Sequence, residues 1–587
     1  MTGQDPWGTL PVARTVLAVA RTVPCTARLL DVAELFRGDE RVAVDFTVNA
    51  GSRFGAGITG MLHDAGVERL VPWNHAVAPE GEFDLALVAN PKGELHRLPV
   101  PMLFMPHGAG HNRLVGTLPG SLSVASGLAR SQLEHRGRTL PARLALSHPE
   151  QVERLRASYP EAAGRAVVVG DPSYDRMLAN LERREHFRRA LGATGGRRLV
   201  VVTSTWHHDS LLGRHGRRLV SALLSQLPHD EYQVALIAHP NIWYRYSPAQ
   251  LRRWLAPELE AGLRLVPPLE GWRATLVAAD VVVGDHGSVS YYAAALGRPV
   301  LLATFGDTLI APDSPLAEFG RATPRLDPDG DLRAQLATAE REGGSLTAAD
   351  LLIQHPGGSA GRMRRLLYEM LRLDPPPVPA PEPPPLRTPE SYTEEPERFA
   401  VEATVDGDGV RVRRFAPLAA GTGDAERFEV VAAERLHPAT AASPDIAVRS
   451  HASESEPPEE WIVRTLRRFP GCGLAAASLS GSRALLRLRD GRALELDAPG
   501  TDLFVAATAV YAWAVDGRPL PALAAGVPVH IGARRTVIRG TPPPMIFAGL
   551  PPIPPPRDHG TTRRTDRDPA TAESPGARTS GPGDGYL

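Results

Sequence analysis

The sequence predicts an α/β protein built from two successive lobes, each with its own parallel sheet. Short apolar runs of strand length alternate with segments of helical periodicity from residue 15 to residue 303. Such an alternation is typical of parallel strands that helices cover on both faces. A charged, arginine-rich helix, Leu181–Leu191, separates two such series. We therefore predict two Rossmann-like lobes, at 1–175 and 176–374, with a cleft between them at the carboxyl ends of the strands.

In the first lobe, the apolar residues of Cys25–Phe36 recur at helical spacing, and Phe54–Ala65 predicts a helix that opens at a glycine-rich turn. Short apolar runs lie between and after these helices. The strands predicted from them are Thr15–Ala20, Arg41–Val48, Val67–Val71, Phe83–Val88, Pro101–Met105, Leu144–Ser147 and Ala166–Val169.

The second lobe contains the most informative stretch, Ala279–Thr304. It reads as a strand, a polar turn with two glycines, an alanine-rich helix and a second strand, which is a βαβ unit. The strands predicted in this lobe are Leu199–Thr203, Gln233–Ala238, Leu263–Val266, Val281–Val283 and Val300–Ala303. The predicted helices are Leu211–Leu227, Pro248–Leu255, Trp272–Ala278, Val289–Leu296 and Ser359–Leu373.

Three further segments follow the two lobes. Residues 375–396 are rich in proline and predict a stiff, extended linker. Residues 397–547 predict a small mixed α/β accessory domain, because two short strand-like runs flank Asp490-Gly491 as in a hairpin and Leu503–Val515 favours a helix. Residues 548–587 have few apolar residues and predict a disordered tail.

The composition excludes several classes of protein. The formal net charge of −1 argues against a general nucleic-acid binder. Lys92 is the only lysine and no G-x-x-x-x-G-K-[ST] motif occurs, so a P-loop nucleotidase is excluded. The two cysteines lie far apart, which is consistent with a reducing compartment. Without a secretion signal or an apolar stretch of about 20 residues, we expect a cytoplasmic protein; peripheral contact with the inner face of the membrane stays open.

Polar motifs follow several of the predicted strands. His107 comes just after Pro101–Met105, and His239 closes Gln233–Ala238. An imidazole at the carboxyl end of a parallel strand reaches the edge where such sheets bind ligands, and its ordinary pKa suits proton transfer near neutrality. The alternative is a loop histidine with no chemical role. These two histidines are the candidate catalytic residues.

Hydroxyl-rich turns at the same predicted edge suit a phosphate. Backbone N–H groups and hydroxyls at the start of a helix carry partial positive charge and unpaired donors. The alternative is that these residues only cap the helices. The candidate donor-binding residues are Thr203, Ser204, Thr205, Asp285, Gly287 and Ser288.

A metal site is not expected from the sequence. His207, His208 and Asp209 are adjacent in the chain. Neighbouring side chains point in different directions, whereas a metal needs ligands that converge. We therefore predict no metal and no cofactor.

The motifs in order resemble the CDP-glycerol glycerophosphotransferase family, the teichoic-acid polymerase and primase type, over about 100–374. His107-Gly108 looks like the start of the family's H-G-T-P segment, and His239-Pro240-Asn241 matches its H-P-N segment. Weaker likenesses are Gly170 to Asp175 to G-x-P-R-x-D, Thr205-Trp206 to A-P-T-W, Ala279 to Ser288 to A-D-x-x-x-T-D-Y-S-S, Gly297 to Val300 to G-K-P-V, and Gly358 to Ala360 to G-x-A. Gly284, His286 and Gly287 replace the family's Thr, Tyr and Ser.

The resemblance implies a GT-B architecture and a transferase that moves glycerophosphate, or a related group, to an acceptor hydroxyl in cell-envelope polymer synthesis. The implied partners are a nucleotide-activated donor and a polymer or lipid-linked acceptor. His107 would be the general base, and His239 would stabilise charge on the donor phosphate. Two alternatives stay open: a GT-B nucleotide-sugar glycosyltransferase or epimerase, and a non-catalytic relative that acts through its C-terminal domain.

Overall fold

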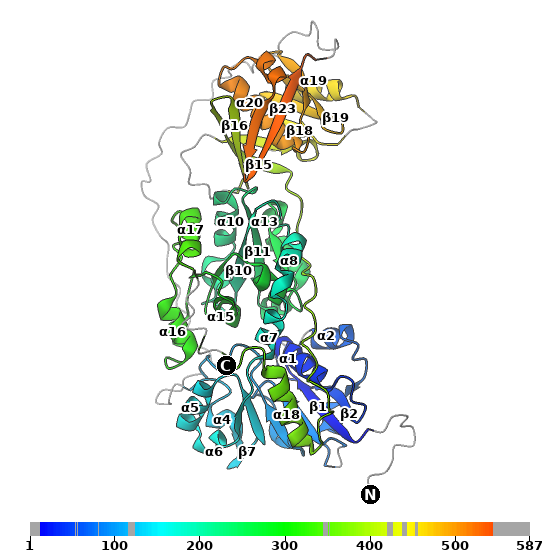
Figure 1. Ribbon diagram of the computed structural model, residues 1–587, viewed down its shortest axis with the longest axis vertical. Helices are drawn as coiled ribbons and strands as arrows, with labels where there is room; N and C mark the ends of the chain where they lie inside the picture. Colours follow the sequence, from blue (N-terminus) through cyan, green and yellow to red (C-terminus); the bar gives the residue numbers. More distant parts are fainter. Residues whose placement is uncertain are drawn as a thin grey trace, which may run out of the picture. The chain divides into compact units, whose positions relative to one another are not determined.

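The computed structural model describes residues 12–52, 55, 57–79, 82–115, 124–343, 350, 353–418, 427–436, 443–451 and 456–543. It divides into two compact units (Figure 1). The first spans residues 1–115, 121–429 and 528–536, and the second spans 116–120, 430–527 and 537–587. The predicted tail at 548–587 lies outside the described residues.

The first sheet of unit 1 is parallel, with strand order β3-β2-β1-β4-β5-β8-β9. Successive residues of β1, an inner strand of the sheet, face opposite sides: Val16 and Ala18 join one apolar cluster, and Leu17 and Val19 join another. This explains why the strands read as continuous apolar runs. The strands are β1 (Arg14–Ala20), β2 (Val42–Val48), β3 (Leu70–Val71), β4 (Leu85–Val88), β5 (Met102–Phe104), β8 (Arg143–Leu146) and β9 (Ala166–Val168).

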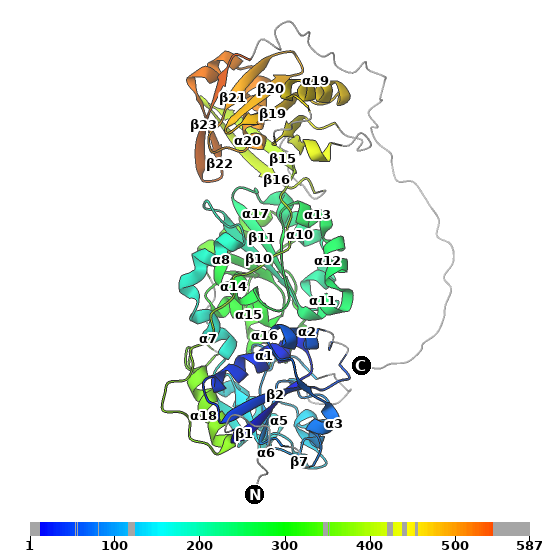
Figure 2. The ribbon, with the colours of Figure 1, turned by 90° about the vertical axis from the view of Figure 1, so that its right-hand side faces the viewer.

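Helices cover both faces of this sheet. One face carries α1 (Val23–Ala33), α2 (Ile58–Asp64) and α18 (Ser359–Leu371). Helix α18 follows the second sheet in the chain yet lies beside β1 (Figures 1 and 2). The other face carries α4 (Arg130–Leu133), α5 (Pro149–Ser158) and α6 (Pro160–Ala163). A short antiparallel pair, β6 (Glu134–His135) and β7 (Arg138–Thr139), follows α4.

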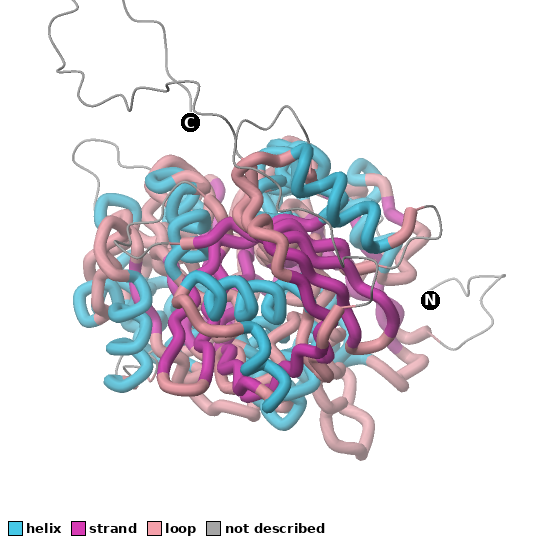
Figure 3. The backbone as a smooth tube through the Cα atoms, turned by 90° about the horizontal axis from the view of Figure 1, so that it is seen from above, coloured by secondary structure: helices cyan, strands magenta, loops and turns pink. Residues whose placement is uncertain are grey.

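The second sheet is also parallel, in the order β12-β11-β10-β13-β14. Its strands are β10 (Arg198–Ser204), β11 (Tyr232–Ala238), β12 (Arg264–Val266), β13 (Val281–Gly284) and β14 (Val300–Leu302). One face packs on α8 (Arg184–Ala190), α14 (Trp272–Ala278), α15 (Ser288–Ala295) and α16 (Pro315–Ala322). The other packs on α10 (Arg218–Gln226), α12 (Pro248–Trp254), α13 (Ala256–Glu260) and α17 (Leu332–Glu342). Figure 3 colours the helices of the chain cyan and its strands magenta.

The two predicted parallel α/β lobes are therefore present, but some helices differ from the prediction. Leu181–Leu191 is a 3-10 turn, Leu181–Arg183, followed by α8. The predicted helix Leu211–Leu227 is two helices, α9 (Leu211–His215) and α10. Gly216 lies between them at φ 56° and ψ −145°. A residue with a Cβ rarely adopts that backbone conformation, so the glycine ends the first helix.

Both sheets reverse their direction of winding at one point, between β1 and β4 in the first and between β10 and β13 in the second. At such a point, loops from neighbouring strands leave the sheet in opposite directions and open a crevice at the carboxyl ends. The residues after β1, β4, β10 and β13 are therefore the ones that the fold itself offers to a ligand.

The proline-rich segment 375–396 packs along unit 1. Arg183 donates from Nη1 to the Leu386 carbonyl at 2.7 Å, and the Leu386 N–H donates to Asn180 Oδ1 at 3.2 Å. Further on, Tyr392 and Leu265 exchange backbone hydrogen bonds of 2.9 Å. The segment is thus held on the second lobe at Leu386 and at Tyr392.

The C-terminal strands are arranged as a closed barrel in the order β15-β16-β22-β23-β21-β20-β19-β18-β17. Its strands are β15 (Arg398–Asp406), β16 (Gly409–Phe415), β17 (Phe428–Ala432), β18 (Ile446–Arg449), β19 (Leu474–Ser480), β20 (Arg483–Leu488), β21 (Ala493–Asp497), β22 (Val527–Ile531) and β23 (Arg534–Thr541). The predicted hairpin is β20–β21, and the predicted helix is α20 (Leu503–Val515). Helix α19 (Pro458–Arg468) packs on β19. Among the helices that the structure describes, none combines the length and apolar composition needed to cross a bilayer.

Candidate active site where the two sheets meet

His107 follows β5 at the carboxyl edge of the first sheet and is exposed to solvent. Its Nδ1 lies 3.1 Å from the carbonyl oxygen of Ala89, the residue after β4. Because a carbonyl oxygen only accepts, Nδ1 carries the proton and donates it. The neutral ring then has its lone pair on Nε2, which is the form that a general base needs.

Cys25 is the unexpected partner of His107. The thiol is fully buried at the start of α1, where it hydrogen-bonds with His107 and accepts from Thr22 Oγ1 at 2.9 Å. Negative charge on Cys25 raises the pKa of His107. Desolvation of the ring lowers this pKa, but by less. Burial acts to raise the pKa of Cys25, yet that pKa is lowered, because the charge of His107 and the hydrogen bonds to the sulfur stabilise the thiolate. Each side chain therefore favours the charged form of the other.

His239 follows β11 in the second lobe and caps helix α11 (Pro240–Tyr246). The Asn241 N–H donates to its Nδ1 at 3.1 Å, so the proton of the neutral ring is on Nε2. Desolvation, together with the positive charges of His107 and Arg113, lowers the pKa of His239 to about 3. His239 is therefore neutral at pH 7 and offers an Nε2–H donor.

Asp285 was expected to bind the donor directly. In the structure it is buried beneath its own turn. Its carboxylate accepts from the N–H groups of Thr205 at 2.8 Å, Leu211 at 2.9 Å and Gly287 at 2.9 Å. Burial raises its pKa to about 6. With no exposed surface, Asp285 fixes two loops relative to each other, so it can act on a ligand only through them.

Thr203 and Ser204 are also buried, at the end of β10. The Ser204 hydroxyl donates to the Thr205 carbonyl at 2.9 Å and accepts from the Leu212 N–H at 3.0 Å. Thr205 itself is half-buried. Of the three predicted hydroxyls after β10, Thr205 is thus the one at the surface of the site, and the other two hold its loop.

Ser288 opens α15 and reaches across to the first lobe. Its Oγ accepts a hydrogen bond of 3.3 Å from the Ala109 N–H, two residues beyond His107. A Cβ on Gly108 would lie 2.9 Å from the same oxygen, so a larger residue there would displace the Ser288 hydroxyl. The N-terminus of α15, with Gly287 and Ser288, therefore lies against the loop that carries His107.

Asp171 joins the lobes behind this contact. Its carboxylate caps α7 (Pro172–Leu178) through the Ser173 N–H at 2.8 Å, and it accepts from Arg28 Nη2 at 3.2 Å and the Tyr292 hydroxyl at 2.7 Å. Arg28 belongs to α1 and Tyr292 to α15. The motif from Gly170 to Asp175 is thus a joint between the lobes, and it fixes both helices that open onto the site.

Arg113 lies near the site and was not singled out from the sequence. Arg113 places its guanidinium over the Trp206 ring, 4.9 Å from the centroid. Its charge lowers the pKa of His239 and of His286. Trp206 lies in the loop after β10, 6.3 Å from the His239 ring between centroids. Arg113 thus places a positive charge near Trp206 and His239. Because it lies in a loop without hydrophobic periodicity, the sequence did not indicate a role for it.

His207, His208 and Asp209 converge, so the expectation that these neighbouring side chains diverge is wrong. Their ligand atoms all lie within 4.8 Å of one another. His207 has φ 98°, a conformation that costs a residue with a Cβ on the order of 1–3 kcal/mol. This turn of the backbone brings consecutive side chains to one side.

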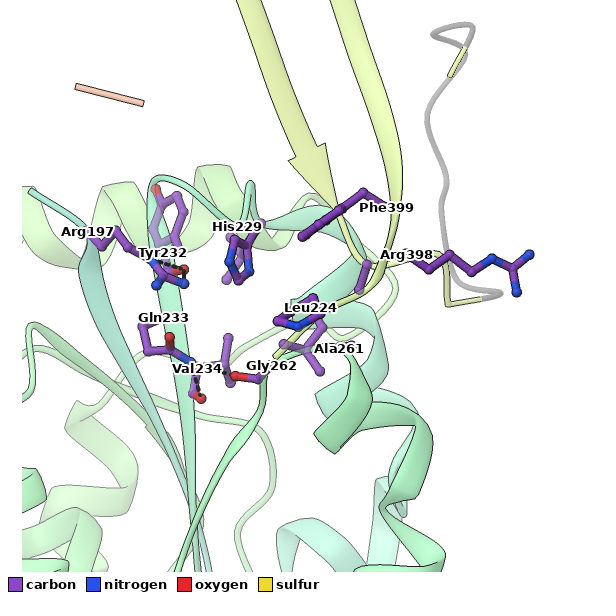
Figure 4. Close-up of a pocket in the computed structure, with 13 residues that line it drawn as sticks. Arg197, Leu224, His229, Tyr232, Gln233, Val234, Ala261, Gly262, Arg398 and Phe399 are labelled. Carbon is purple, nitrogen blue, oxygen red and sulfur yellow. Dashed lines mark hydrogen bonds between the residues drawn. The ribbon is translucent and has the colours of Figure 1, made fainter. Parts of the chain in front are cut away.

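A small pocket lies at the opposite edge of the second sheet (Figure 4). It is lined by residues at the amino ends of β10 and β11, among them Arg197, His229 and Gln233. Water centres can occupy about 10 Å³ of it, which is room for about one water molecule. Gln233 Nε2 donates to the Gly262 carbonyl at 2.7 Å along its wall. Its size and position separate it from the candidate site.

The site therefore joins a base-type histidine, a donor-type histidine, an arginine and a helix N-terminus at the carboxyl edges of two parallel sheets. No protein family and no curated protein sequence matches the chain. Among solved structures, it is similar to S. aureus MnaA with UDP (13% identity, TM-score 0.39, covering 62% of this chain and 98% of that one). It is also similar to the wall teichoic acid polymerase TagF (12%, 0.41, 61% and 89%) and to the Methanocaldococcus jannaschii UDP-GlcNAc 2-epimerase (12%, 0.41, 61% and 99%). These values define no family for this chain.

Proposed function

We propose that the protein is a transferase that moves glycerophosphate, or a related phosphate-linked group, from a nucleotide-activated donor to an acceptor hydroxyl in cell-envelope polymer synthesis. The observation that carries the proposal is the pairing of His107 and His239. They come from different lobes, and hydrogen bonds fix them in opposite tautomers. One has a lone pair for a hydroxyl proton, and the other has a proton for a phosphate oxygen.

The proposed step needs no nucleophile from the protein. His107 accepts the proton of the acceptor hydroxyl at Nε2 while the hydroxyl oxygen attacks the donor phosphorus. The phosphoanhydride bond to the nucleotide breaks, and the nucleoside monophosphate leaves with the bonding electrons. His239 Nε2–H and Arg113 stabilise the charge that develops on the phosphate oxygens. Positioning and electrostatics supply most of the catalysis in reactions of this kind.

The proposed donor site is formed by Thr205, Gly287 and Ser288 at the start of α15. Because the N–H groups of Thr205 and Gly287 donate to Asp285, the hydroxyls of Thr205 and Ser288 and the partial positive charge of the helix end would attract the phosphate. Asp285, Thr203 and Ser204 are proposed as positioning residues, because their polar groups are buried against the protein. The hydroxyl of Ser288 would exchange its contact with Ala109 for the donor.

A nucleotide-sugar glycosyltransferase or epimerase is the second candidate. The turn between β13 and α15 favours it. There Asp285 is buried and His286 is nearly buried, and both side chains contact protein groups, so neither is available to contact a donor. The Gly306 N–H donates to His286 Nδ1 at 3.2 Å. Neither side chain can therefore select a glycerol unit over a sugar.

The test is thermal stabilisation of the full chain by CMP, CDP, CDP-glycerol, UDP, GDP and common nucleotide sugars. A ligand at about 100 times its Kd adds about 2.7 kcal/mol of stability. Selective stabilisation by cytidine nucleotides, followed by release of CMP in the presence of an acceptor, is the expected result. A selective response to uridine or guanosine nucleotides would favour sugar chemistry. No response to any of them would contradict both, and would leave a non-catalytic role that depends on the C-terminal region.

A further inference from the structure

We propose that His207, His208 and Asp209 bind a divalent transition-metal ion of the Zn²⁺ class. The carrying observation is convergence: two imidazoles and one carboxylate place their ligand atoms within 4.8 Å of one another. Imidazole nitrogen combined with carboxylate oxygen suits Zn²⁺ and its neighbours rather than Mg²⁺ or Ca²⁺, which prefer oxygen ligands. The site goes beyond the proposed transfer reaction and does not depend on it.

Two of the three ligand atoms form a direct contact in the metal-free chain, at a spacing close to that between two ligands of one ion. His208 Nε2 lies 3.1 Å from Asp209 Oδ2. Two atoms that each lie about 2.1 Å from one ion, at the tetrahedral angle, are about 3.4 Å apart. The ring of His207 lies beside that of His208, with centroids 4.1 Å apart. The His207 ligand atom lies within 4.8 Å of the other two and is the third member of the set.

Asp209 is held in place from behind. Arg214 Nη2 donates to its Oδ1 at 2.6 Å, which leaves Oδ2 directed at His208. The carboxylate is nearly buried, whereas both histidines are exposed. This is the arrangement of a metal ligand with an outer partner that orients it. The exposed side of the triplet leaves coordination positions for water or another ligand.

The backbone around the triplet is fixed. The Ser210 N–H donates to the His207 carbonyl at 3.1 Å, and the Ser210 hydroxyl donates to the same oxygen at 2.7 Å. A Cβ on Gly213, in α9, would lie only 2.2 Å from that carbonyl. The glycine therefore lets the loop that carries His207 lie directly against α9. Asp285 holds Thr205 and Leu211 on either side of the loop. The protein therefore compensates for the positive φ of His207, and the convergence does not depend on a bound ion.

The test is a titration of Zn²⁺, and separately of Co²⁺, into the untagged full chain after treatment with a chelator. Calorimetry is expected to give one Zn²⁺ per chain, and Co²⁺ is expected to give visible absorption bands. His208→Ala and Asp209→Asn should each weaken Zn²⁺ at least about tenfold, since loss of an outer partner alone costs that much. The matched control is His96→Ala, because His96 and His135 form another exposed imidazole pair, with ring centroids 3.9 Å apart.

A second readout guards against a variant that fails to fold. Zn²⁺ should raise the melting temperature of the wild type and of the His96→Ala variant, and should raise that of Asp209→Asn by less. The site is overturned if Zn²⁺ does not bind, or if it binds equally to the wild type and Asp209→Asn. Binding that is lost in the His96→Ala variant also overturns it, because the ion then sits on the other pair. Since no nucleotide is present, these outcomes are independent of the donor panel.

Discussion

His107 and His239 look alike in the sequence and differ in the structure. Each follows an apolar strand of a parallel sheet, and each lies where the two lobes meet. His107 donates from Nδ1 to a backbone carbonyl and has a raised pKa because of the negative charge of Cys25. His239 accepts at Nδ1 from a backbone N–H, and desolvation lowers its pKa to about 3. The same side chain is thus prepared to accept a proton in one lobe and to donate a hydrogen bond in the other.

The comparison shows that the backbone group beside Nδ1 decides the role of each ring. After β5 the chain continues into a loop, and the neighbouring strand offers a carbonyl, that of Ala89. After β11 a helix begins at once, and helix starts present N–H groups. A histidine that caps a helix therefore keeps its proton on Nε2, whereas one beside a strand end can keep it on Nδ1.

The largest expected effect comes from removing the base. His107→Ala should lower kcat by about 10²–10⁴, because a positioned general base contributes that much. The Kd of the donor should change little, since the proposed donor groups lie on the second lobe. Steady-state kinetics together with donor binding by calorimetry measure both quantities. Full turnover in this variant would contradict the assignment of the base.

His239→Asn should have a smaller effect on kcat, about 10²-fold, and should also weaken donor binding. Asparagine caps helices well, so α11 keeps its cap while the Nε2–H is lost. A decrease in kcat of this size is what removal of one hydrogen-bond donor to a developing negative charge causes in other enzymes.

The matched control for His239→Asn is His148→Asn. His148 caps α5 through the same geometry, with the Glu150 N–H donating to its Nδ1 at 3.2 Å, and proline follows it as well. The control should leave kcat and the donor Kd within twofold of the wild type. Equal losses in the two variants would show that the cap matters, and not the Nε2–H.

The sequence alone predicts much of this arrangement. The alternation of strands and helices predicted both sheets and therefore the edge at which His107 and His239 lie, because parallel strands end at one edge. The helix break at Gly216 was missed, since a single glycine in an apolar series does not reveal its φ value.

The roles of individual polar residues were less predictable. Asp285 looked like a ligand group, yet its oxygens are used by backbone N–H groups that become its neighbours only after folding. Arg113 reaches Trp206 across the two lobes, and Cys25 reaches His107 across two strands. Such contacts depend on the order of strands in the sheet, which periodicity does not report.

The smallest expected effect tests the cause of the difference between the two histidines. At present the charge of Cys25 raises the pKa of His107, so the neutral, active base forms only as the pH rises through that raised value. Cys25→Ser removes the thiolate and leaves a small hydroxyl in the buried position. The pKa of His107 should then fall, and the acid limb of the kcat/KM profile should move to lower pH. The ratio of activity at pH 6 to activity at pH 8 should therefore rise, while the profile of an enzyme whose base is a different group would keep its position.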